Sequence, residues 1–529
     1  MLEIREFASG SRPVIAALAA IAWLASASPA PAAPGEYLPV GDAIESELRM
    51  LDILGPAVPG RRFRMPHTGT RPLQVSELDS LPAPDDASDF ARRISLVRIG
   101  RVLAREVGAD ALAGIPGQSP RLIQRRYPEE LTAEASVGAE GGGGFSHSQP
   151  LYASGSGVHV RLGLALDHWL AHADLVAGYQ DSARSFADPI FLDTDITTFT
   201  SEIYLGYTGS GGRWNVQVGR SRWHWGPGEE ASLLLSKTAP AITGLAFHVR
   251  LEPLRADLTA LSATLRSSAG EQLAAHRIEW QPADGVRVGI AEAARYRASG
   301  WHPLYVVGLI PYQLVQRLQL QDEPGAIPAL RNNVIVAADA SWRVAPGTRI
   351  YGEYLLDDMH FIRLVTIPNK YAYQVGWEGV APAFGARATW GIELTRVTRF
   401  VYTSSFGRDF SVQGQPLGFP FAPDARRLRV RVGWDPAAAW QLIAVGTETL
   451  RGENTLQEPF LPGTPTVDAA RFEGVVTRTR EIETGVRWWP AGGIDLEARA
   501  GYQWVEHAAH LPGVDTESPS ARLALRLVR

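Results

Sequence analysis

The sequence contains no cysteine, and this absence excludes several kinds of chemistry. Without thiols the chain can form neither disulfides nor thiolate metal sites, and it has no cysteine nucleophile. Lysine is almost as scarce, since Lys237 and Lys370 are the only two. Arginine therefore carries the positive charge. Either the base composition of the gene favours arginine, or its fork geometry is used to bind carboxylate or phosphate.

Charge and hydropathy exclude further classes. The formal net charge is −5, so a general affinity for nucleic acid is not expected. Beyond the N-terminal region, no stretch approaches the roughly 20 apolar residues that a membrane-spanning helix needs. Arg5 and Arg12 precede an apolar run at 14–25, and small residues follow at 26–33. This pattern predicts a secretory signal peptide over 1–33, and hence export.

Residues 34–126 are predicted to form a small helical domain. A helix is expected after Asp42, where Glu45 completes a capping box and Ile44, Leu48 and Leu51 recur at helical spacing. A second helix is expected over about 87–107. The arginines between its apolar positions are expected to form a solvated face: Arg92, Arg93, Arg98, Arg101 and Arg105.

Residues 127–529 show a period of two instead. In one segment, Leu428, Val430, Val432 and Trp434 alternate with Arg427, Arg429 and Arg431. A face so rich in arginine cannot be a dry core. Apolar-out, polar-in alternation over about ten residues is typical of outer-membrane barrel strands. The predicted fold class is therefore mainly β, a transmembrane antiparallel β-barrel with an N-terminal periplasmic α-helical domain.

The connections between these segments alternate in length. Short turn signals, such as 208–212, 281–285 and 344–347, alternate with longer connections, such as 298–330 and 402–425. The alternation predicts about eighteen strands, with short turns in the periplasm and long loops outside. Tryptophans near the short turns are expected to form an aromatic girdle: Trp169, Trp214, Trp280, Trp342, Trp377, Trp434, Trp440, Trp488 and Trp489. We expect the outer membrane of a Gram-negative bacterium as the location.

Catalytic candidates are few. Ser221, His224 and Glu229 lie close together in the sequence, but this segment has no nucleophile elbow. Ser146, His147 and Ser148 lie in the glycine-rich loop 141–150, where the glycines favour mobility over a preorganised site. We therefore expect no enzyme. A barrel that hydrolyses lipids remains a minor alternative.

Two groups of residues are candidates for ligand binding. Asp357, Asp358 and His360 close a predicted strand and could hold Ca²⁺, although solvated charges or pairs with Arg349 or Arg363 are favoured, and no metal or cofactor is expected. Aromatic rings in predicted outer loops either stack on sugar rings or pack a loop into the lumen. These are Trp301, His302, Tyr305, Tyr312 and Phe406.

Several stretches resemble the capsule-assembly Wzi family. The main one is GRSRWHWGPGEEASLLLS (219–236) with PAITGL (240–245). YGEYLLDD (351–358), NKYAYQVGWE (369–378) and ELTRV (393–397) are similar to later landmarks, and YLPVGDAIESELRMLDILG (37–55) to the family's N-terminal helix. GQPLGFPFAPDA (414–425) also resembles a family loop, but Phe419 stands where the family usually has a histidine. The resemblance covers essentially the mature chain.

The resemblance implies an eighteen-stranded outer-membrane barrel with a periplasmic helical bundle. It also implies a non-enzymatic, lectin-like protein that attaches or organises capsular polysaccharide or exopolysaccharide at the cell surface. The partners expected are surface polysaccharide and outer-membrane lipid, with polysaccharide-export machinery as a further candidate. The alternative from the residues is an outer-membrane porin or saccharide channel, because rows of luminal arginine suit anionic solutes and such a barrel is wide enough for a pore.

Within the main stretch, a scaffold role is expected for the family-motif residues. Gly226, Pro227 and Gly228 are expected to reverse the chain sharply after a strand that contains Gly219 and Arg220. Trp223 and Trp225 are expected to wedge the returning loop against the wall or lumen, with direct sugar binding as the alternative. Arg220 and Arg222 are expected to pair with Glu229 and Glu230.

Overall fold

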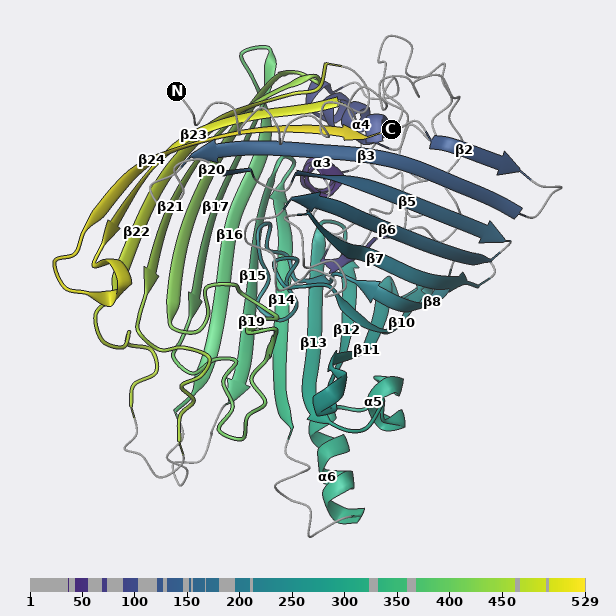
Figure 1. Ribbon diagram of the computed structural model, residues 1–529, viewed down its shortest axis with the longest axis vertical. Helices are drawn as coiled ribbons and strands as arrows, with labels where there is room; N and C mark the ends of the chain where they lie inside the picture. Colours follow the sequence, from purple (N-terminus) through teal and green to yellow (C-terminus); the bar gives the residue numbers. More distant parts are fainter. Residues whose placement is uncertain are drawn as a thin grey trace.

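The chain forms an antiparallel β-barrel, which confirms the predicted fold class (Figure 1). The computed structural model describes residues 37, 43–55, 69–73, 89–102, 121–126, 131–145, 152–153, 156–166, 168–179, 196–209, 213–322, 332–358, 368–461, 467–490 and 494–528. Each wall strand pairs with the wall strands before and after it, and β24 pairs with β3 to close the barrel. The wall strands are β3 (Leu131–Phe145), β5 (Ser156–Leu166), β6 (Trp169–Tyr179), β7 (Ile196–Thr208), β8 (Trp214–Ser221), β10 (Ile242–Leu251), β11 (Ala256–Arg266), β12 (Glu271–Ala283), β13 (Val286–Arg297), β14 (Asn333–Ala345), β15 (Thr348–Asp358), β16 (Lys370–Ala383), β17 (Ala386–Val397), β20 (Ala425–Ala437), β21 (Trp440–Arg451), β22 (Thr477–Trp488), β23 (Ile494–Glu506) and β24 (Thr516–Val528).

Smaller elements lie between and inside these strands. β1 (Thr70–Arg71) pairs with β9 (His224–Trp225), β18 (Ser411–Val412) pairs with β19 (Gln415–Pro416), and β4 (Tyr152–Ala153) adds to β3. The helices are α3 (Ala43–Leu54), α4 (Phe90–Val102), α5 (Pro303–Val307) and α6 (Tyr312–Asp322), with 3₁₀ turns η6 (Glu252–Leu254), η7 (Ser267–Ala269) and η9 (Ala508–His510). Among the described residues, no helix is long and apolar enough to cross a membrane.

One part of the predicted helical domain is a strand. β2 (Arg121–Arg126) pairs with β3 through residues such as Ile123 and Ala135, so the stretch adds to the wall sheet. The helical prediction up to residue 126 is wrong there, because the edge of β3 beside β24 offers unpaired backbone groups that a short extended segment satisfies. Helices α3 and α4 lie inside the first and second predicted helices.

The alternation predicted for the wall is confirmed. On β20, Leu428, Val430, Val432 and Trp434 are 37–52% exposed on the outer surface, whereas Arg429 and Arg431 form ion pairs in the lumen. On β5, Val160, Leu162, Leu164 and Leu166 are exposed in the same way, and Arg161 pairs with Asp174 at 3.0 Å. The barrel therefore has an apolar outside and a charged inside, as membrane barrels have.

The two rims differ, as the connection lengths predict. Trp169, Trp214, Trp280, Trp342 and Trp377 lie beside short turns and are 38–52% exposed. The longer connections leave the opposite rim, where α5 and α6 lie between β13 and β14 (Figure 1). A tryptophan girdle at the short-turn rim is the arrangement expected at a bilayer interface.

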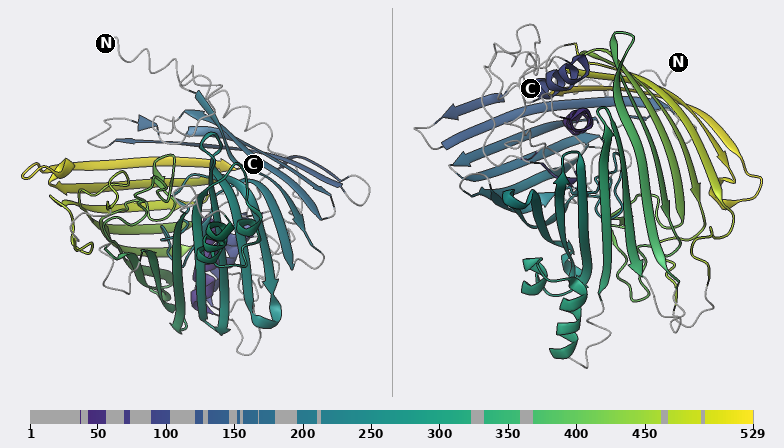
Figure 2. Two further views of the ribbon diagram at one scale, coloured as in Figure 1. Left: turned by 90° about the horizontal axis from the view of Figure 1, so that it is seen from below. Right: turned by 180° about the vertical axis from the view of Figure 1, so that it is seen from behind.

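Helices α3 and α4 lie within the lumen near the short-turn rim, and together they are called the plug here (Figure 2). They pack against each other and contact β15, β16 and β17. The solvated arginine face predicted for the second helix is wrong for Arg92 and Arg98, which are 8% and 5% exposed. Their guanidinium groups bind the carbonyl of Gly55 and the barrel wall. These arginines are therefore hydrogen-bonded to protein groups instead of being hydrated by water.

Candidate functional site

Buried ion pairs hold the plug to the wall. Glu47 of α3 accepts two hydrogen bonds from Arg387 of β17, at 2.7 and 3.0 Å, and one from Arg98 of α4, at 2.9 Å. Arg98 and Arg387 also both donate to Asp435 of β20, at 3.0 and 2.6 Å. Burial alone raises the pKa of Glu47, but attraction to Arg387 and Arg98 outweighs it and holds this pKa well below its usual range. These charges are paired and hydrogen-bonded, which is the condition under which buried charge is tolerated.

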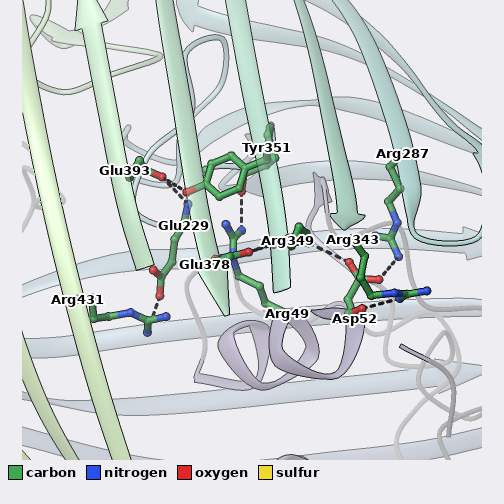
Figure 3. A network of polar contacts seen from close by, with 12 residues as sticks. Arg49, Asp52, Glu229, Arg287, Arg343, Arg349, Tyr351, Glu378, Glu393 and Arg431 are labelled. Atoms are coloured by element: carbon green, nitrogen blue, oxygen red, sulfur yellow. Dashed lines mark hydrogen bonds and ion pairs between the residues drawn. The ribbon is translucent and has the colours of Figure 1, made fainter. Parts of the chain in front are cut away.

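A second network joins α3 to three further wall strands (Figure 3). Arg49 donates to Glu378 of β16 at 2.8 Å. Asp52, one turn further along α3, accepts from Arg287 at 3.0 Å and from Arg349 at 2.9 Å. Helical spacing thus places Arg49 and Asp52 on neighbouring positions that face a wall of opposite charges.

The pairing predicted for Glu229 and Glu230 with Arg220 and Arg222 is wrong. The loop after β9 crosses the lumen, so its carboxylates reach the opposite wall. Burial alone raises the pKa of Glu229, but Arg431 and Arg429 outweigh it and lower the pKa to about 2. The ion pairs are Glu229–Arg431 at 2.8 Å, Glu229–Arg429 at 3.4 Å and Glu230–Arg427 at 3.3 Å.

The segment 222–241 builds an apolar core inside the barrel. Trp225, Leu233 and Leu234 are fully buried, and Trp223 is 9% exposed and contacts Trp225 edge-to-face at 6.4 Å between ring centroids. Both rings therefore pack inside the barrel. Direct sugar binding by Trp225 is excluded by this burial, because no face of the ring is open to a ligand.

Hydrogen bonds fasten this core to the wall and to an outer connection. Glu353 of β15 accepts from the backbone N of Leu233 at 3.1 Å and from the Ser232 hydroxyl at 3.0 Å. Tyr402 donates its hydroxyl to the carbonyl of Leu233 and accepts from the backbone N of Phe419 at 3.2 Å. Residues 398–424 thus fold into the lumen and meet the segment 222–241 there.

The sequence predicts a long outer connection here and leaves open that an aromatic ring packs this loop into the lumen, but it does not identify which side chains of residues 398–424 become buried. Phe410 and Leu417 are at most 1% exposed in this core. Phe419 is 2% exposed, and it occupies the position where the similar family usually has a histidine. The sequence signal that could have indicated this burial is the high density of aromatic residues in 398–424, which do not follow the period of two of a wall strand. At this position the chain presents a buried ring and no imidazole.

Two glycines permit the entry of the returning loop. Gly219 has φ +148° and Gly226 has φ +146°. A Cβ atom on Gly219 would lie 2.1 Å from the carbonyl oxygen of Ile203, and one on Gly226 would lie 2.5 Å from the hydroxyl of Ser232. Arg49 donates to the carbonyl of Pro227 at 2.5 Å, so the Gly-Pro-Gly turn contacts the plug directly.

A polar cavity of about 220 Å³ remains between the plug and strands β20 to β23. Its lining includes Glu47, Arg98, Glu229, Arg431 and Trp489, most of which take part in the ion pairs above. The space beside the plug is therefore lined by charged side chains.

The catalytic candidates do not assemble. The hydroxyl of Ser221 accepts from Gln217 at 2.5 Å, while His224 Nε2 lies 3.1 Å from the carbonyl of Gly228. Burial, together with Arg71 and Lys237, lowers the pKa of His224 well below its usual value. Glu229 is bound to arginines, so the three groups of a Ser–His–acid triad have separate partners. Ser146, His147 and Ser148 lie outside the described residues.

The predicted outer-loop aromatics divide into two groups. Trp301 and Phe406 are each 38% exposed, and the guanidinium of Arg408 lies 5.8 Å from the Phe406 ring centroid. His302 is half-buried and caps α5 by accepting from the backbone N of Leu304 at 3.3 Å. Tyr305 and Tyr312 are fully buried, which leaves their ring faces closed to sugar.

The predicted Asp357–Asp358–His360 group is only partly described. Asp357 is buried and accepts from the backbone N of Tyr402 at 2.6 Å, so it supports the inward-folded connection. The side chain of Asp358 and the whole of His360 lie outside the described part. Arg349 binds Asp52 and Glu378 rather than this group. Across the described residues, no three His, Asp or Glu side chains gather as a metal site.

Comparison with known proteins supports the architecture. No family model matches the chain, and no curated protein matches it. Among solved structures, the chain is similar to Wzi of Escherichia coli, described as an outer-membrane protein involved in group 1 capsule assembly and as a carbohydrate-binding β-barrel. The likeness covers 93% of this chain and 99% of that one, at 12% identity and a TM-score of 0.60.

Two further structures show lower similarity. OccK5 (OpdH) of Pseudomonas aeruginosa is 10% identical over 74% of this chain and 97% of its own, with a TM-score of 0.42. The outer-membrane channel DcaP of Acinetobacter baumannii is 10% identical over 76% and 99%, with a TM-score of 0.37. The chain thus has the fold of an outer-membrane barrel and, over nearly its whole length, the architecture of the Wzi structure.

Proposed function

We propose that this protein is a plugged outer-membrane barrel that binds surface polysaccharide at its outer mouth and holds it at the cell, without turnover. The observation that carries the proposal is that the plug and two inward-folded segments lie in the lumen. The plug is ion-paired to the wall at one end, and the segments 222–241 and 398–424 share an apolar core further along. A barrel occupied in this way is suited to displaying loops rather than to passing solutes.

The likeness to a carbohydrate-binding barrel supports polysaccharide as the ligand class. The candidates for contact are the exposed Trp301 and Phe406 and the half-buried His302, with Asp358, His360 and the buried Trp223 kept as predictions. Phe406 offers an exposed ring on which a sugar ring can stack. The periplasmic side remains the proposed contact for export machinery.

Binding can be tested with purified protein and exopolysaccharide from the same bacterium, immobilised on a sensor surface. We expect Phe406→Ala to weaken binding about tenfold through the loss of ring stacking. Phe384→Ala is the matched control, because Phe384 is 99% exposed on the short turn between β16 and β17 at the opposite rim. Equal affinity of both variants and the native protein would remove Phe406 from the site.

Conductance in planar bilayers separates this proposal from a porin or saccharide channel. We expect no stable open steps from the native protein, because the plug and the inner core occupy the lumen. Steady ohmic conductance that is blocked by a soluble saccharide would contradict the proposal and favour the channel.

A further inference from the structure

The α5–α6 hairpin lies on the outside of the barrel wall. Strand residues alternate between the two faces of the wall. Ala275, Ala293 and Ile335 belong to the core inside the lumen, whereas their neighbours Ala274 and Ala294 pack against Tyr305 and Tyr312 of the hairpin. The hairpin therefore covers the surface that elsewhere carries the exposed apolar belt.

The hairpin covers a polar pair on that outer surface. His276 of β12 lies opposite Glu292 of β13, with 3.4 Å between Nε2 and Oε2. The backbone N of Tyr312, the first residue of α6, donates to Glu292 at 2.8 Å, and the Tyr312 ring lies 4.6 Å from the His276 ring. Tyr305 stacks on Tyr296 at 4.1 Å, which fixes α5 beside the pair.

The pair lies at membrane depth. His276 is four residues from Trp280 of the tryptophan girdle, and a tilted strand climbs about 10 Å over that distance. The apolar band of such barrels is about 25 Å tall. Ile278 and Ile290, just below the pair, are 46% and 57% exposed on the belt. An imidazole and a carboxyl group facing acyl chains here would be costly, and the hairpin shields them.

The outer face of the hairpin is itself largely apolar, although Gln313 and Arg317 are also exposed. Val307, Leu309, Leu314 and Leu318 are 43–67% exposed, and Leu314 and Leu318 lie one turn apart on α6. The exposed Arg317 is the adjacent cation. This face continues the belt of the wall at the outer rim, so its occupant is the medium that surrounds the belt.

We propose that α5–α6 is a lipid-embedded hairpin, whose apolar face contacts the acyl chains of the outer leaflet while Arg317 reaches toward anionic head groups. Trp301 and His302, at its start, then lie at the lipid surface. The inference does not depend on carbohydrate binding. It assigns to this connection an anchoring surface that the barrel wall alone does not provide.

The absence of cysteine makes a site-specific test direct. Leu318→Cys and Leu309→Cys would each carry one environment-sensitive fluorophore in protein reconstituted into phosphatidylcholine vesicles containing nitroxide-labelled phosphatidylcholine. Ile290→Cys on the belt is the lipid reference, and Phe384→Cys on the short turn is the aqueous reference. Two hairpin positions are used so that one poorly folding variant does not decide the result.

We expect the labels at both hairpin positions to be quenched by nitroxide lipid as strongly as the Ile290 reference, and to be protected from aqueous iodide. Quenching by iodide as at Phe384, without quenching by lipid, would overturn the proposal. Protection from both quenchers would also overturn the proposal, because protein, such as a second copy of the chain, would then cover the face in place of lipid.

Discussion

Glu47 on α3 and Arg387 on the barrel wall form a two-point ion pair, at 2.7 and 3.0 Å, although 340 positions separate them in the sequence. Both side chains are at most 10% exposed. A short helix is thereby fixed to a barrel strand by charge, and this ion pair holds the plug to the inner wall.

Removing one member of this pair should loosen the plug. We expect Arg387→Gln to lower the free energy of plug opening by about 3 kcal/mol, because it leaves buried carboxylates with too few cations. Hydrogen exchange of the α3 amides would measure this change. Arg471→Gln is the control, since its pair with Asp468 is exposed at 85% and 58% and should contribute little. Unchanged exchange in α3 would contradict the role given to Arg387.

The plug should also respond to acid in a defined direction. The pKa of Glu229 is lowered to about 2 and that of Glu47 is held still lower, against an ordinary value of 4.5. Because both are lowered in the folded state, their stabilisation is complete above pH 4.5 and is lost as the pH falls from 4.5 toward 2. Protease cleavage of α3, measured with an acid-stable protease, should be constant down to about pH 4.5 and then rise. Release near neutral pH would contradict this assignment.

Trp225 should act through packing rather than through ligand contact. We expect Trp225→Ala to destabilise the folded barrel by roughly 3 to 5 kcal/mol, because a fully buried indole leaves a large cavity. Trp225→Phe should cost less, since much of the volume is kept. Thermal unfolding in detergent would give both values, with Phe384→Ala as the exposed control. A native melting temperature for Trp225→Ala would show that the inner core is not formed as described.

Gly219 should tolerate no side chain. Its φ of +148° and the 2.1 Å approach of a Cβ atom to the Ile203 carbonyl predict a loss of about 2 kcal/mol or more for Gly219→Ala. Gly446→Ala on β21 is the matched control, because nothing lies within 4 Å of its Cβ position. The fraction of folded barrel on a non-boiled gel would compare the two. Equal folding of both variants would contradict the close approach at Gly219.

The sequence predicts the wall well because each wall residue obeys a local rule. The alternation of Val430 and Val432 with Arg429 and Arg431 is decided by lipid on one side and the lumen on the other, and the exposed side chains follow it. The girdle follows from tryptophans beside short turns for the same reason. Neither inference needs knowledge of distant contacts.

The interior could not be predicted in this way. The partners of Glu229 are Arg429 and Arg431, 200 or more positions away, whereas local spacing pointed to Arg220 and Arg222. The prediction of a solvated arginine face on α4 assumes that this helix is exposed to water, whereas in the structure it packs against the barrel wall. Likewise, Tyr305 looks like a loop aromatic until the fold places it on the outer wall. Long-range closure of the barrel decides all three.

The most direct test of the central claim uses a strain that lacks this protein. Cells and medium would be separated, and the surface polysaccharide in each fraction would be quantified, with the native protein and the Phe406→Ala variant restored in parallel. We predict unchanged total polymer that shifts from cells to medium, with return to the cells on restoring the native protein and a smaller return with the variant. An unchanged distribution in the strain without the protein would contradict retention of polysaccharide by this barrel.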